Sequence, residues 1–320
     1  MMRTGPSLVA ILLALTVPAS AQTSVPMPPP APNAAADNGA IDLAFGAYQR
    51  GFYLTAFNEA AKRAQNNDVN AMTLLGELYA QGLGVGRDDS KAAQWYKLAA
   101  AKGDRDALFA LAMFNFEGRA GPRSPDEAAR LLAEAAKLGH PAANYDLGLL
   151  YLQGQQFKQD FKQAADLFQI AATAGSPEAQ YALATMYKEG RGVPKDAKRA
   201  ADLLRQASIA GNLDAMVEFA IMLFNGNGTD KNEAAAAQLF LAAARRGSPI
   251  AQNRLARILM AGRGLPANPA EAVRWHIIAR AAGASDAELE IFAAKQPQAV
   301  RDAADKAAKR WMSTLTALKK

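Results

Sequence analysis

Apolar and small residues recur along this chain with a fixed period of 36 residues. Six consecutive units begin at alanines, namely Ala71, Ala107, Ala143, Ala179, Ala215 and Ala251. Each unit then carries a large apolar residue followed by a small one, at Leu75-Gly76, Leu111-Ala112, Leu147-Gly148, Leu183-Ala184, Phe219-Ala220 and Leu255-Ala256. A period of this length is typical of solenoids built from stacked helical units. The large and small neighbours indicate a helix that packs closely against another.

Glycines and capping residues mark the ends of the expected helices. A glycine closes the first helix of every unit, at Gly82, Gly118, Gly154, Gly190, Gly226 and Gly262. Glycine suits that place because it adopts the left-handed conformation that commonly ends a helix. Six residues later an N-cap residue predicts a second helix, at Asp88, Ser124, Asp160, Asp196, Asn232 and Asn268. Two units add the proline and glutamate of a capping box, at Ser124-Pro125-Asp126-Glu127 and Asn268-Pro269-Ala270-Glu271.

The second helix of each unit has one apolar face. In the first unit Ala92, Ala93, Tyr96 and Ala99 follow the spacings of three and four that define such a face, and the other units repeat them. A glycine closes this helix at Gly103, Gly139, Gly175, Gly211, Gly247 and Gly283. The next cap follows at Asp104, His140, Ser176, Asn212, Ser248 and, after the last unit, Ala284-Ser285. Because neither helix can bury its apolar face alone, we expect the units to stack into an α-solenoid.

The N-terminal segment resembles a secretory signal peptide. In residues 1–21, Arg3 precedes an apolar run, and Ala19-Ser20-Ala21 fits a cleavage site. We therefore expect cleavage after Ala21 and a mature protein, beginning at Gln22, that is periplasmic or secreted. No later apolar run is long enough to span a bilayer, so we expect no integral membrane segment in the mature chain.

The rest of the chain divides around the array. Residues 22–38 are rich in proline and alanine and predict an extended linker. Residues 39–70 read as a degenerate repeat that caps the N-terminal end of the six units in 71–284. Residues 285–320 predict helices that cap the other end.

The amino-acid composition limits which kinds of reactive and metal-binding sites the chain can contain. Cysteine is absent and histidine occurs twice, which excludes disulfides, thiolate nucleophiles and cysteine-ligated zinc. We therefore expect neither a metal site nor a cofactor. The net charge of +6 is spread over 320 residues without a basic run, so we expect no nucleic acid partner.

The first unit, from Ala71 to Tyr96, resembles the Sel1-like repeat family, which is related to the tetratricopeptide repeat. Its segments Leu75-Gly76, Gly82-Leu83-Gly84-Val85 and Ala92-Ala93-Gln94-Trp95-Tyr96 match the family pattern, and the resemblance extends over all six units. It implies an all-α fold, a right-handed superhelical α-solenoid of helix-turn-helix units. It also implies an adaptor that holds a protein or peptide in a concave groove, often within envelope signalling, secretion or polysaccharide assemblies.

The resemblance also indicates which residues line the groove. In tetratricopeptide relatives the groove is lined by the positions that correspond here to the third, seventh and tenth of each unit. Several of these positions carry larger apolar side chains than a monomeric protein usually exposes, which suits a hydrophobic helix or an extended peptide. The predicted partner-binding residues are Phe109, Met113, Phe116, Tyr145, Leu149, Leu152, Tyr181, Val217, Ile221 and Phe224.

Two other interpretations of these apolar residues stay open. The register could be off by one residue, or tight curvature could bury these side chains against neighbouring helices. Alternatively, the C-terminal helices of residues 285–320 fold back onto the groove or pair two molecules. The sequence therefore predicts neither the oligomeric state nor the identity of the partner.

No catalytic motif stands out in the sequence, which has no S-x-x-K, no G-x-x-x-x-G-K-[ST] and no H-E-x-x-H. We expect His140 to cap a helix and His276 to pack in an aromatic position. The prediction is a non-enzymatic interaction scaffold. The alternative is a glycan- or peptidoglycan-binding or glycan-modifying module, which the shortage of polar partners in the middle units disfavours.

Overall fold

The computed structural model describes residues 42–318 as sixteen α-helices, and this part of the chain contains no β-strand. The predicted all-α fold is confirmed. The expected signal peptide, the expected linker and the first residues of the degenerate repeat lie outside the described residues.

Six helical pairs follow two N-terminal helices, α2 (Leu43–Gln49) and α3 (Tyr53–Gln65). The first helices of the pairs are α4 (Val69–Gln81), α6 (Arg105–Glu117), α8 (Pro141–Gln153), α10 (Pro177–Glu189), α12 (Leu213–Asn225) and α14 (Pro249–Ala261). The second helices are α5 (Asp89–Ala100), α7 (Pro125–Lys137), α9 (Phe161–Thr173), α11 (Ala197–Ile209), α13 (Glu233–Arg245) and α15 (Pro269–Ala281). Two further helices complete the chain, α16 (Ala287–Ala294) and α17 (Gln298–Leu318).

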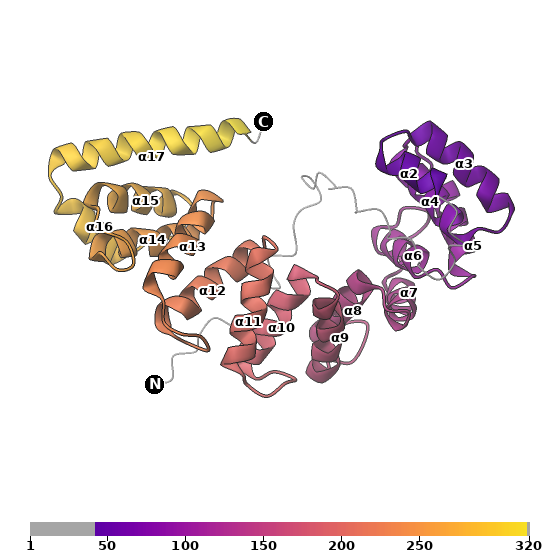
Figure 1. The fold of residues 1–320 in the computed structure, drawn as a ribbon, viewed down its shortest axis with the longest axis horizontal. Helices are drawn as coiled ribbons and strands as arrows, with labels where there is room; N and C mark the ends of the chain where they lie inside the picture. Colours follow the sequence, from indigo (N-terminus) through magenta and orange to yellow (C-terminus); the bar gives the residue numbers. More distant parts are fainter. Residues whose placement is uncertain (1–41, 319–320) are drawn as a thin grey trace.

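The helical pairs stack into a solenoid that bends into an arc, with α2 and α3 at one end and α16 and α17 at the other (Figure 1). From α2 to α15, each helix packs against the one that follows it in the chain. Small residues allow this close packing. One alanine of the second helix has no exposed surface in any repeat, at Ala92, Ala128, Ala164, Ala200, Ala236 and Ala272.

One backbone hydrogen bond closes the loop inside every repeat. The N–H of the residue that caps the second helix donates to a carbonyl near the end of the first helix, over 2.8–3.1 Å. The six bonds run from Asp88 to Tyr79, Ser124 to Asn115, Asp160 to Tyr151, Asp196 to Tyr187, Asn232 to Leu223 and Asn268 to Leu259. The glycine between them is left-handed in all six repeats, as predicted.

The pairing of large with small residues has the expected cause. A Cβ added to Gly76 would lie 2.5 Å from the ring of Tyr96, on the second helix of the same repeat. Gly148 faces Phe168 in the same way, at 2.6 Å. Glycine is required where the facing ring leaves no room for a methyl group.

Side-chain caps occur at most of the predicted helix starts. The imidazole of His140 accepts a hydrogen bond from the N–H of Ala143 through Nδ1, at 3.0 Å. The capping role predicted for His140 is therefore confirmed. Asp88, Asp104 and Asn212 also accept cap bonds from their own helices.

Three helix starts differ from the prediction. Asn268 caps its helix, but Glu271 pairs with Arg274 and does not complete the expected capping box. Ser124 makes no side-chain cap bond, and Glu127 pairs with Arg130 instead of completing a capping box. After the last repeat the cap is Asp286, not Ala284-Ser285. The longer carboxylate of Asp286 accepts from two backbone N–H groups of α16.

A second glycine in four of the loops brings each repeat against the helix before it. Gly192, between α10 and α11, has a φ of +70°, and a Cβ there would lie 2.1 Å from the carbonyl oxygen of Phe161 on α9. The same approach occurs at Gly84, Gly228 and Gly264. The other two loops carry Ala120 and Gln156 at this position, neither with a positive φ, so their course differs.

The two C-terminal helices cover the last repeat. The ring of Trp311 on α17 lies edge-on to Trp275 of α15, with centroids 5.6 Å apart. His276 is 1% exposed, so its predicted packing role is confirmed, and its Nε2 lies 3.1 Å from the carboxylate of Glu290 on α16. Within residues 42–318, no helix combines the length and the hydropathy that a membrane span requires.

Replacing Gly192 by alanine should destabilise the array more than replacing Gly211 by alanine. Both glycines have a positive φ, so each substitution adds backbone strain of about 1–2 kcal/mol. Only at Gly192 does the new Cβ meet a carbonyl oxygen, because nothing lies within 4 Å at Gly211. Urea unfolding followed by circular dichroism should show at least about 1 kcal/mol of extra loss for Gly192→Ala. Equal losses would mean that this contact does not hold neighbouring repeats together.

Candidate partner-binding face

Four first helices, α6, α8, α10 and α12, carry the ten residues predicted to bind a partner. Phe109 and Val217 are buried, at 6% and 5% exposed. The other eight are partly exposed, and we call them the first-helix strip: Met113, Phe116, Tyr145, Leu149, Leu152, Tyr181, Ile221 and Phe224. All eight also pack against the core with part of their surface. That these residues contact a partner stays a prediction.

Ion pairs join neighbouring units along the same face. Lys188, the tenth residue of its unit, pairs with Glu218 on the next first helix. Arg257, the seventh residue of the last unit, pairs with Asp286 at the start of α16, at 2.6 Å. The first pair links the tenth position of one unit to the fourth position of the next, and the second links the last unit to α16.

The aromatic residues in the middle of the strip lie among carboxylates. Burial raises the pKa of Tyr145 to about 12, and the charges of Asp146 and Glu178 add to the effect. Burial and the charge of Glu218 likewise raise the pKa of Tyr181 to about 12. Both hydroxyl groups therefore stay protonated near neutral pH and can donate a hydrogen bond to a partner.

Asp146, next to Tyr145 on α8, is a carboxyl group without a partner among the described residues. Burial raises its pKa from 3.8 to about 7. No cation or hydrogen-bond donor of residues 42–318 offsets the loss of hydration. The carboxyl group therefore titrates near neutral pH.

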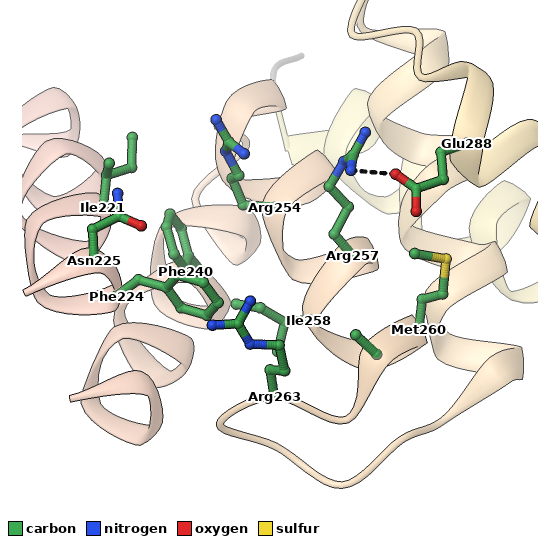
Figure 2. A pocket seen from close by; sticks show the side chains of 11 residues that line it. Ile221, Phe224, Asn225, Phe240, Arg254, Arg257, Ile258, Met260, Arg263 and Glu288 are labelled. Atoms are coloured by element: carbon green, nitrogen blue, oxygen red, sulfur yellow. Dashed lines mark hydrogen bonds and ion pairs between the residues drawn. The ribbon is translucent and has the colours of Figure 1, made fainter. Parts of the chain in front are cut away.

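A hollow of about 290 Å³ lies between α12 and α14, at the C-terminal end of the strip (Figure 2). Ile221 and Phe224 line it from α12, and Met260 lines it from α14. The buried side chains of Phe240 and Ile258 complete its apolar lining. We call this cavity the α12–α14 hollow.

Two arginines beside the α12–α14 hollow are neutralised within the chain. The guanidinium of Arg257 pairs with both Asp286 and Glu288, each at 2.6 Å, and Figure 2 shows its contact with Glu288. Arg263 pairs with Glu233, and this contact lowers the pKa of the Glu233 carboxyl to about 2.

A third arginine, Arg254, is exposed and makes no hydrogen bond or ion pair with any residue of 42–318. It is the fourth residue of its unit, outside the third, seventh and tenth positions from which the strip was predicted. The same position holds no other arginine or lysine, since the earlier units carry Leu74, Ala110, Asp146, Ala182 and Glu218. A basic residue at a position that is not basic in the other units is the only sequence signal that could have indicated Arg254.

The two histidines do not belong to a metal-binding cluster in the described part of the chain. No group of three or more His, Asp or Glu side chains in residues 42–318 could hold a metal ion. Burial lowers the pKa of His140 to about 4, and its Nε2 lies 3.3 Å from Asp106. The neutral imidazole therefore serves as a hydrogen-bond acceptor at its helix start.

A family model described as the Sel1 repeat matches six segments of the chain, residues 69–104, 105–140, 141–176, 177–212, 213–248 and 249–283. Each matched segment begins at the first residue of a first helix. Together the segments cover about two thirds of the chain. No curated protein matches it.

Solved structures of similar proteins support the solenoid fold. A Sel1 repeat protein from Oxalobacter formigenes is 26% identical, with a TM-score of 0.63 over 74% of this chain and 94% of that chain. A protective antigen of uropathogenic Escherichia coli strains that displays an SLR fold is 24% identical. Its TM-score is 0.67 over 82% of this chain and 59% of that chain.

Replacing Asp146 by asparagine should stabilise the protein at pH 8 and leave its stability unchanged near pH 4. The pKa of Asp146 is higher in the folded state, so the wild-type protein loses stability as the pH rises from about 4 to about 7. The amide avoids that loss, and we expect a gain of up to about 4 kcal/mol at pH 8 in urea unfolding, because each unit of pKa difference corresponds to about 1.4 kcal/mol. Asp202→Asn, at an exposed aspartate of α11, is the control and should show no such pH dependence. A gain that is the same at both pH values would contradict the assignment.

Proposed function

This chain belongs to the Sel1 repeat family, and from that premise we propose that it is a non-enzymatic scaffold that binds a partner protein or peptide along the first-helix strip. Repeat folds of this kind commonly act as scaffolds for protein interaction. The observation that carries the proposal is the strip itself, eight large apolar side chains on the first helices that the fold leaves partly exposed.

The partner would bind by placing apolar side chains against the strip. An amphipathic helix or an extended segment can supply them at a regular spacing. Each large side chain that becomes fully buried contributes about 1.5–3 kcal/mol. The hydroxyl groups of Tyr145 and Tyr181 would add directional hydrogen bonds.

We further propose that the protein is exported and acts in the periplasm or outside the cell, where it regulates an envelope signalling, secretion or polysaccharide complex. The support for export is the pattern of residues 1–21, a basic residue, an apolar run and an Ala-Ser-Ala cleavage site.

Removing apolar surface from the strip should abolish partner binding. We expect the full chain, incubated with an envelope extract of the source cells and crosslinked, to retain a specific protein that mass spectrometry identifies. The double variant Tyr181→Ser/Phe224→Ser removes two side chains of the strip and should retain at least about tenfold less of it.

The matched control removes as much apolar surface from the second helices. Ile170 and Ile209, on α9 and α11, are 50% and 76% exposed, so Ile170→Ser/Ile209→Ser should fold and retain the partner. Loss of the partner in the control, or its retention by both variants, would contradict binding at the strip. Retention of glycan instead of protein would support the glycan-binding alternative.

The location has its own test. When the full chain is expressed with a C-terminal tag, the tagged product should be found in the periplasm or the medium, and N-terminal sequencing should begin at Gln22. A product that keeps Arg3 and stays in the cytoplasm would contradict the proposed export.

A further inference from the structure

Two hollows on the face of the last two repeats share two arginines. The α12–α14 hollow has Arg254 and Arg257 on its α14 side. A second, more open hollow of about 470 Å³ lies between α14 and the start of α16, and the same two arginines line it. Ile250, 58% exposed, lies at this second hollow. Arg254 therefore stands between two places that offer apolar surface.

The charges around these hollows leave one cation without a counterion. Arg257 is held by Asp286 and Glu288, and Arg263 by Glu233. Arg254 has no such acid in the described residues, although it lines the same cavity. A guanidinium beside apolar surface pairs with a carboxylate more strongly than one surrounded by water, because nearby apolar groups lower the local dielectric.

We propose that the two hollows bind a peptide segment of a partner protein in which an acidic side chain is flanked by large apolar side chains. The carboxylate pairs with Arg254. One apolar side chain enters the α12–α14 hollow against Phe224 and Ile221, and the other lies against Ile250. This inference rests on the proposed scaffold function and adds to it the chemistry of the partner segment.

The dimensions and polarity of the α12–α14 hollow favour a peptide side chain over a whole small molecule. Its volume of about 290 Å³ lies just below the range of ligand pockets, which is about 300–1,000 Å³. Its walls carry apolar side chains, and two of its three arginines are already paired. A multiply charged ligand would therefore find one free cation and little else to bind.

A display library of random linear peptides tests the proposal on the full chain. Peptides selected by the wild-type protein should be enriched in Asp or Glu close to large apolar residues. Selection on Arg254→Glu should instead enrich Lys or Arg at that place, because the charge that the peptide meets is reversed. A selected peptide should bind Arg254→Gln about tenfold more weakly than the wild-type protein.

Arg245→Gln is the matched control, because Arg245 is an exposed arginine on the second helix α13 and lines neither hollow. It should select and bind the same peptides as the wild-type protein. Circular dichroism should show both arginine variants to be folded. Unchanged selection on Arg254→Glu, or no acidic enrichment with the wild-type protein, would overturn the inference.

The experiment separates this inference from the proposed function. Peptides that bind without an acidic preference, but are lost with Tyr181→Ser/Phe224→Ser, would leave the scaffold function in place and remove the role of Arg254. If those peptides also bind that double variant unchanged, binding at the strip itself is contradicted.

Discussion

The whole array depends on the backbone hydrogen bond that closes each loop, because this bond makes the period of the repeat independent of most side chains. The carbonyl that accepts it belongs to Tyr79, Asn115 or Leu223 in different repeats, with similar distances. The side chain at that position can therefore vary, whereas the length of the loop cannot. A constant loop length keeps successive first helices in one register. Because of that register, the residues of the first-helix strip lie on the same face of successive helices.

Repetition makes most of the fold predictable, because each helix-ending glycine and most caps occur six times in the sequence. Contacts that occur in only some repeats give no such signal. Asn144, Gln180 and Gln252 are buried in the core, where their side-chain amides donate to carbonyls at the end of the preceding second helix. Other repeats carry Met72 and Leu108 at the same position. In the sequence, a polar residue at this second position of the unit looks like ordinary variation. Only the structure shows that its side chain is buried and hydrogen-bonded.

The sequence predicts which helices carry the candidate site residues, but it does not predict how exposed those residues are. The cap residue of the next repeat can cover the third position of a first helix, and both Phe109 and Thr73 are buried in this way. Phe109 stacks on His140 with ring centroids 4.4 Å apart, and Thr73 donates to the carboxylate of Asp104. The α12–α14 hollow is completed by residues outside the six repeats, because the acids that pair with Arg257 lie at the start of α16. The repeat period of the sequence predicts neither the contacts at the third position nor the ion pairs of Arg257.

Charges at the fourth position of the units give the first-helix face a direction. Asp146 in the third unit and Arg254 in the sixth have no partner among the described residues, while Glu218 between them is held by Lys188. A partner bound along the strip as proposed would therefore meet a carboxyl group in the middle of the array and a guanidinium at its C-terminal end. Apolar contacts alone would accept a helix in either orientation, whereas opposite charges disfavour one of them.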